Sequence, residues 1–321
     1  MDLHVSGWMV VGNKCSSRVG LQPPLTAGRR DAGSELKEAE RLRARRRGRR
    51  HMTVACSTIC ATATGLDEAL QKIAATGFRD VDLMAFANWA HLAPADITDD
   101  PGKAAAFVAE LLDRHGLRAV AMNVGQSYPT NTSDLAQRAQ NLRELRAVAA
   151  FAGQLRIPVI ALQPGHKDAG CSYDEAFALS VTAFQEITEA VAGSDLAVTF
   201  EPHSGSVAET YDSMQALLDA VPALGVAYDP SHFVAMGLDV AESAFLLPRT
   251  AHVHLRNAVQ GNFQAPMDKG TLDFAWVVEQ LKAHGYDRAL AIEYLDGRED
   301  MPTVSADIVQ LKELLLSLTV G

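Results

Sequence analysis

One pattern constrains this chain more than any other: from residue 53 onward, helix-like and strand-like segments alternate eight times. Helical segments end at or near a glycine, and a short run of β-favouring residues follows. Gly77 precedes the run at 80–84, and Gly285 precedes the run at 289–293. Glycine adopts the left-handed backbone conformation that ends many helices. The pattern predicts strands near residues 53–58, 79–84, 118–124, 157–163, 196–201, 224–229, 250–255 and 289–294, and helices near 66–76, 102–115, 134–154, 173–192, 210–219, 239–247, 272–284 and 304–319.

Strict alternation of strands and helices predicts an α/β fold with a parallel sheet. Eight such units within roughly 270 residues match a closed (β/α)8 TIM barrel, which we expect as a single domain over residues 52–321. An open, doubly wound sheet is the alternative, but no Gly-x-Gly-x-x-Gly follows the first strand. The chain also has neither a P-loop nor a Gly-x-Ser-x-Gly elbow, which argues against those two kinds of site.

The first 51 residues differ from the rest of the chain in charge and in patterning. They hold 12 Lys and Arg against 5 Asp and Glu, include an Arg-rich run at 41–50, and lack a sustained apolar period. Such a segment cannot bury enough apolar surface to fold, so we expect a disordered basic extension. An arm that binds nucleic acid or anionic lipid and a targeting peptide are the alternatives. A true start at Met52 would explain the change in composition simply.

The remainder of the chain is acidic, with 34 Asp and Glu against 17 Lys and Arg. This balance argues against a nucleic-acid partner and is compatible with bound divalent cations. No run of about 18 apolar residues occurs, so no membrane partner is expected. The four cysteines, which form no Cys-x-x-Cys pair, argue against a thiolate zinc site and fit a reducing cytoplasm: Cys15, Cys56, Cys60 and Cys171.

Polar residues gather where the later predicted strands end, and TIM barrels carry their chemistry at the C-terminal ends of the strands. A single Glu or His at such a position is commonly structural. Four such residues together favour a functional site, because three carboxylates at one rim repel one another unless a cation neutralises them. Oxygen-rich ligation with one imidazole suits Mn²⁺, Mg²⁺, Co²⁺ or Zn²⁺. We therefore expect one divalent ion, with these ligands: Glu201, Asp229, His254 and Glu293.

His252 and His254 lie on the same face of the predicted seventh strand, because side chains alternate with period 2. His254 is nearer the rim and is the better ligand. His252 is expected one layer deeper, as a core residue or as a support for the ligands.

Several motifs resemble those of the xylose-isomerase-like TIM barrel superfamily, the group of sugar phosphate isomerases and epimerases. The resemblance covers about residues 53–317 and is carried by Thr199-Phe200-Glu201-Pro202-His203, Tyr228-Asp229-Pro230-Ser231-His232-Phe233, His252-Val253-His254-Leu255-Arg256, Gly270-Thr271-Leu272-Asp273-Phe274 and Ala291-Ile292-Glu293-Tyr294. It implies the same four metal ligands, with Glu201 and Glu293 as the catalytic acid/base pair. The chain departs from the 3-epimerases at 204–207, which lack a carboxylate, and in the register of Arg256.

The resemblance implies a divalent-metal-dependent sugar or sugar phosphate isomerase or epimerase that moves a proton next to a carbonyl through an enediolate. Two points stay open here: which glutamate removes the proton, and whether the protein forms a homo-oligomer. A metal-dependent lyase or dehydratase acting on a keto-sugar or keto-inositol uses the same parts. An apurinic-site endonuclease and a non-catalytic sugar-binding barrel are further alternatives. The expected partner is a carbohydrate, bound by His232, His203, His166, Arg256, Gln264 and Lys269.

Overall fold

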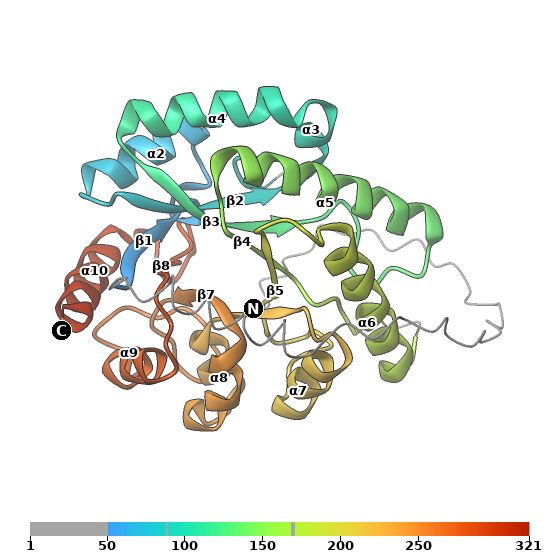
Figure 1. Ribbon diagram of the computed structural model, residues 1–321. Coiled ribbons are helices and arrows are strands. Elements are labelled where there is room, and N and C mark those ends of the chain that lie inside the picture. The colour runs from blue at the N-terminus through green and yellow to red at the C-terminus, as the bar shows by residue number, and fades with distance from the viewer. Residues whose placement is uncertain (1–50, 88, 168–170, 321) are drawn as a thin grey trace, which may run out of the picture.

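Eight parallel strands close into a barrel in the computed structural model, which describes residues 51–87, 89–167 and 171–320. Each strand pairs with the next along the chain, and the last pairs with the first, where Ala55 lies opposite Ala291. Figure 1 shows the strands at the centre with the helices around them. The predicted (β/α)8 barrel is confirmed, and every predicted strand is present: β1 (Thr53–Ser57), β2 (Asp80–Phe86), β3 (Arg118–Gly125), β4 (Val159–Leu162), β5 (Ala197–Phe200), β6 (Gly225–Tyr228), β7 (Thr250–Leu255) and β8 (Ala289–Ile292).

The helices alternate with the strands and cover the outside of the barrel. None of those described is both long and apolar enough to cross a membrane. The predicted division into an extension over residues 1–51 and a barrel over residues 52–321 stays a prediction, because nearly all of the extension lies outside the described residues. The helical elements are η1 (Thr58–Ala61), α2 (Leu66–Ala75), α3 (Pro94–Asp99), α4 (Pro101–His115), α5 (Leu135–Leu155), α6 (Tyr173–Ala190), α7 (Tyr211–Ala220), α8 (Pro230–Met236), η2 (Val240–Arg249), α9 (Phe274–Ala283) and α10 (Ser305–Thr319).

Three short elements were not predicted from the sequence: η1, α3 and α8. They span four, six and seven residues, which is too short for an apolar period to be recognised. Local signals explain α8, since Asp229 caps its first turn, Pro230 opens it, and Gly237 ends it at φ 73°. The predicted helix at 239–247 is present as the 3₁₀ element η2.

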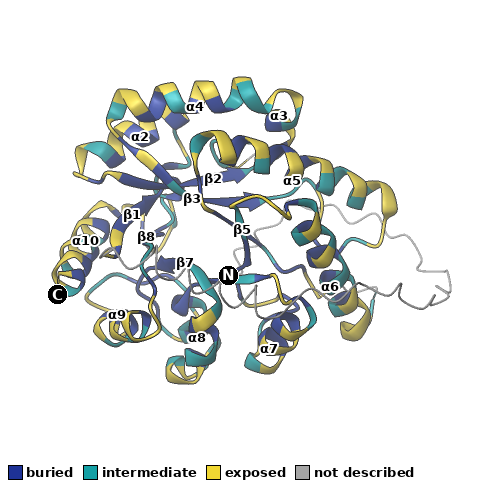
Figure 2. Cartoon of the chain, in the orientation of Figure 1, coloured by how far each residue is buried: buried dark blue, intermediate teal, exposed yellow. Residues whose placement is uncertain are grey.

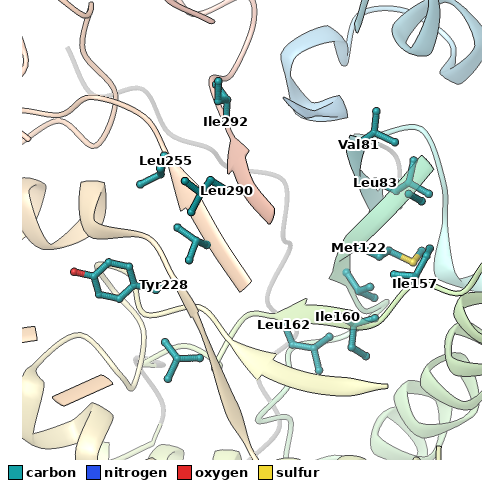
Figure 3. Packing of buried hydrophobic residues seen from close by; sticks show 14 of the residues in the cluster. Val81, Leu83, Met122, Ile157, Ile160, Leu162, Tyr228, Leu255, Leu290 and Ile292 are labelled. Atoms are coloured by element: carbon teal, nitrogen blue, oxygen red, sulfur yellow. The ribbon is translucent and has the colours of Figure 1, made fainter. Parts of the chain in front are cut away.

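Alternation along the strands separates an apolar outer shell from a partly polar barrel interior. Val81 and Leu83 belong to the apolar cluster between the strands and the helices (Figure 3), whereas Asp82 between them faces the interior. The helices bury the faces that cover the strands and expose the opposite faces (Figure 2). Small residues, Ala55, Ala289 and Ala291, form a separate cluster with Val120. Because these residues are small, the interior has room for the polar side chains that build the site.

Candidate metal and catalytic site

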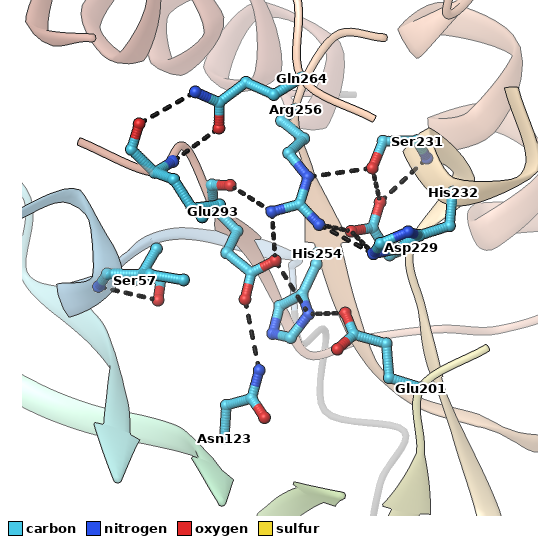
Figure 4. Close-up of polar contacts among 12 residues, drawn as sticks. Ser57, Asn123, Glu201, Asp229, Ser231, His232, His254, Arg256, Gln264 and Glu293 are labelled. Atoms are coloured by element: carbon cyan, nitrogen blue, oxygen red, sulfur yellow. Dashed lines mark hydrogen bonds and ion pairs between the residues drawn. The ribbon is translucent and has the colours of Figure 1, made fainter. Parts of the chain in front are cut away.

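Four acidic and imidazole side chains converge at the C-terminal ends of β5 to β8. Glu201 and Glu293 directly follow β5 and β8, Asp229 follows β6 and caps α8, and His254 lies in β7. Each offers a ligand atom, and these atoms all lie within 4.8 Å of one another. All four residues are buried, with Glu201 the most exposed at 7%. Figure 4 shows the carboxylates of Glu201 and Glu293 on either side of the His254 ring.

The donor chemistry of this cluster fits a divalent cation. Three buried carboxylates at this spacing repel one another, and a bound cation offsets this repulsion. Oxygen donors with one imidazole match the preferences of magnesium, manganese and zinc. The Nδ1 atom of His254 faces the carboxylates, at 2.6 Å from Glu201 Oε1 and 3.6 Å from Glu293 Oε2. The residues present therefore suit one ion held between β5, β6, β7 and β8.

The pKa values of the two glutamates shift in opposite directions from their ordinary value. Burial raises the pKa of Glu293 to about 7, helped by repulsion from Glu201 and Asp229 and opposed by His254 and Arg256. Burial also acts to raise the pKa of Glu201, but attraction and a hydrogen bond from His254 outweigh it and hold the pKa below its ordinary value. Two carboxylates with separated pKa values are the usual arrangement for an acid and a base in one site.

Arg256 supplies a permanent positive charge inside the cluster. Its Nη2 donates to Asp229 Oδ2 at 2.6 Å, and its Nη1 lies 2.8 Å from Glu293 Oε2. Its Nε donates to Ser231 Oγ at 3.0 Å, so all three nitrogens contact protein atoms. The side chain is 3% exposed. One arginine and one divalent ion would balance the three carboxylates, and Arg256, expected from the sequence to bind substrate, here orients two of them.

A row of imidazoles continues from the cluster over the ends of β4, β5 and β6. The ring of His203 lies 5.8 Å from that of His232 and 6.5 Å from that of His166. Burial and the charge of Arg256 hold the pKa of His232 well below its ordinary value, so this ring is neutral. The ring also stacks on Phe263 at 5.3 Å. His203 Nδ1 contacts its neighbour Ser204, while its buried Nε2 has no hydrogen-bond partner among the described residues.

Two other predicted binding residues lie on the loop between β7 and α9. Gln264 is fully buried and exchanges two hydrogen bonds with the backbone of Leu295, which ties this loop to the one after β8 (Figure 4). Lys269 is exposed on the same loop, and its ammonium forms no ion pair with any described residue. The structure therefore brings His232, His203 and His166 together, whereas the hydrogen bonds of Gln264 connect two loops.

A family model matches residues 70–314, and its description is xylose isomerase-like TIM barrel. The chain belongs to this family. No curated protein sequence matches the chain. The resemblance drawn from the strand-end motifs is thereby confirmed at the level of the family.

Solved structures of other proteins share this fold at low sequence identity. A D-tagatose 3-epimerase-like protein superposes with a TM-score of 0.68 at 20% identity, covering 83% of this chain and 97% of the other. A D-allulose 3-epimerase from Methylomonas sp., in complex with D-allulose, gives 0.67 at 17%, covering 84% and 98%. A xylose isomerase-like protein from Mycobacterium smegmatis, in complex with magnesium, gives 0.66 at 13%, covering 84% and 96%. At these identities the likeness shows the fold alone.

Two residues that contact the candidate site were given no role in it from the sequence, and both come from the first half of the chain. Asn123 in β3 donates from Nδ2 to Glu293 Oε1 at 3.3 Å. Asp82 in β2 lies 2.9 Å from His254 Nε2 and 3.1 Å from His252 Nε2, measured to its Oδ2. His252 is buried beneath His254, with the two rings 4.6 Å apart. A lone acid between apolar residues in β2 was the available signal for Asp82.

Proposed function

We propose that the protein is a divalent-metal-dependent isomerase or epimerase of a sugar or sugar phosphate. The observation that carries this proposal is the buried cluster of Glu201, Asp229, His254 and Glu293, in which two glutamates have pKa values displaced in opposite directions. The D-tagatose 3-epimerase-like protein and the D-allulose complex among the structural neighbours support the same class of reaction.

In this proposal the four clustered residues hold the ion, which when bound polarises the substrate carbonyl and stabilises the negative charge that develops there. Glu201, kept ionised beside His254, removes a proton from the carbon next to the carbonyl. Glu293, which burial makes the weaker acid of the two glutamates, returns a proton. Arg256 fixes the carboxylates of Asp229 and Glu293, so each oxygen keeps its orientation during the transfer.

The histidine row is the proposed contact surface for substrate hydroxyl groups. His203 Nε2 is buried and unpartnered among the described residues, and such an atom gains a hydrogen bond when a hydroxyl approaches. His232 is neutral, so its ring neither repels a nearby cation nor takes up the proton in transfer. In this proposal the rings distinguish sugars by the positions of their hydroxyl groups.

The test is solvent deuterium incorporation by the full chain. Metal is stripped, Mn²⁺ or Mg²⁺ is restored, and a panel of ketoses and ketose phosphates is incubated in deuterated water. We expect exchange at the carbon next to the carbonyl with at least one substrate, and none in the stripped protein. Undiminished exchange without metal would contradict the proposal. Formation of a dehydrated product in place of an isomer would instead indicate the lyase alternative.

A further inference from the structure

A second polar layer lies inside the barrel directly beneath the proposed metal ligands. It consists of Asp82 from β2 together with His252 and His254 from β7. The side chains of Asp82 and His254 are fully buried, and that of His252 is 2% exposed. The small residues Ala55, Ala289 and Ala291 also occupy the interior of this part of the barrel. The proposed reaction uses His254 only, so Asp82 and His252 need their own explanation.

Hydrogen-bond chemistry decides which nitrogen of His254 carries a proton. A neutral imidazole has one N–H donor and one lone pair. Asp82 Oδ2 lies 2.9 Å from Nε2 and, as a carboxylate oxygen, can only accept. Nδ1 also faces a carboxylate, Glu201 Oε1 at 2.6 Å, so both nitrogens can donate in the metal-free protein. When an ion occupies the proposed site, Asp82 keeps the proton on Nε2, and the proton that is displaced is the one on Nδ1. That nitrogen faces Glu201 and Glu293, where a ligand is required.

His252 strengthens the same arrangement from one layer below. Its Nε2 lies 3.1 Å from the oxygen that His254 contacts, and its ring stands nearly perpendicular to that of His254. One oxygen of Asp82, Oδ2, therefore accepts from both rings.

We propose that Asp82 is a positioning residue for the metal centre: it fixes the ring orientation and the tautomer of His254 and so presents Nδ1 to the ion, while His252 holds Asp82 in place. This inference rests on the proposed metal site. Metal-bound histidines usually donate their second N–H to such a partner, and loss of the partner commonly costs about 10–100-fold in metal affinity.

The same three residues could instead hold an ion of their own, since their ligand atoms also lie within 4.8 Å of one another. That reading requires His254 to give up the proton on Nε2. If Nδ1 also bound an ion, the imidazole would have to lose both of its protons. Hydrogen bonds to Asp82 Oδ2 engage the Nε2 atoms of both histidines without that cost, while Asp82 Oδ1 has no partner among the described residues. The two readings differ in the number of ions bound per chain.

The experiment titrates the metal-free full chain with Co²⁺, following visible absorption and binding heat. We expect one ion per chain in the unaltered protein and a dissociation constant about 10–100-fold higher in Asp82→Asn. Asp80→Asn is the matched control: it alters a buried aspartate two residues earlier on β2 that pairs with Arg118, and should leave affinity unchanged. His252→Gln should give a smaller loss than Asp82→Asn.

A second measurement reads the tautomer directly, by long-range proton–nitrogen NMR of the imidazoles in the Zn²⁺-bound protein. We expect a protonated Nε2 on His254 in the unaltered chain, and this result decides the matter if Asp82→Asn does not fold. Unchanged Co²⁺ affinity in Asp82→Asn, two ions per chain, or an ion on Nε2 would overturn the inference. If the unaltered chain binds no divalent ion at all, the proposed function fails instead.

Discussion

The two halves of the barrel have the same architecture and different rims. The residues that follow β1 to β4 are uncharged: Thr58, Ala87, Gln126 and Gln163. The residues that follow β5 to β8 are all charged: Glu201, Asp229, Arg256 and Glu293. Strand pairing is parallel throughout, so the backbone does not distinguish the halves. The chemistry therefore depends on which side chain stands at each strand end, as expected for a fold that carries many reactions.

In the proposed metal site, the first half contributes support rather than ligands. Asp82 and Asn123 reach across the barrel to His254 and Glu293. The buried acid Glu144 of α5 stays within its own half, where it accepts hydrogen bonds from the backbone and hydroxyl of Ser127. One half thus supplies the groups that would touch the ion, and the other supplies partners that orient those groups.

The strongest test of this division compares one buried glutamate from each half. Glu293→Gln should keep an ion at saturating metal but lose deuterium incorporation into the isomerised or epimerised product by about 10²–10⁴-fold, because the amide cannot return a proton to the substrate carbon. Glu144→Gln should leave this incorporation per folded molecule unchanged. Incorporation and metal content are measured on the same samples. Normal incorporation in fully metallated Glu293→Gln would mean that β8 carries only a ligand.

A second comparison uses two aspartates that cap helices. Asp229 caps α8 and Asp134 caps α5. Asparagine caps helices about as well as aspartate, so both substitutions preserve the helix start. Asp229→Asn should weaken Mn²⁺ binding by at least about 10-fold, since even the loss of a ligand's partner has such an effect. Asp134→Asn should bind Mn²⁺ normally, and equal affinities in the two variants would remove Asp229 from the ligand set.

A smaller effect is expected when Asn123, in the first half of the barrel, is replaced. Asn123→Ala removes a long hydrogen bond of 3.3 Å to Glu293, a loss of about 0.5–1.5 kcal/mol, so turnover should fall by about 2–10-fold. A donor to a carboxylate favours its ionised form, so its removal raises the pKa of Glu293. Glu293 must be protonated to return the proton, and activity should therefore persist to higher pH. A pH–rate profile that keeps its alkaline limb in place would show that Asn123 does not act on Glu293.

The charged half of the site was predictable from the sequence because its signals are local. Glu201, Asp229 and Glu293 each follow an apolar strand, and alternation separates His252 from His254. The supporting residues were not predictable because their contacts join positions about 170 residues apart. The position of Arg256 between two carboxylates likewise depends on how neighbouring strands are placed in the barrel. Strand order follows from alternation, whereas side-chain pairing across a closed barrel does not.

The smallest expected effect concerns a surface contact far from the ligands, between α2 and α4 of the first half. Asp67 accepts hydrogen bonds from His115 Nε2 and Arg114 Nη1, each at 2.6 Å. The bond from His115 is the largest cause of a lowered Asp67 pKa. A carboxylate with a lowered pKa stabilises the folded state above its unfolded pKa of about 4, and the stabilisation disappears as pH falls through the folded pKa.

Because the pair is exposed, Asp67→Asn should lower the melting midpoint by only about 1 °C at pH 7. The difference should vanish near pH 2 and shrink in high salt, with deuterium exchange unaffected throughout. A midpoint difference that persists at low pH would show that packing, rather than charge, connects these two helices.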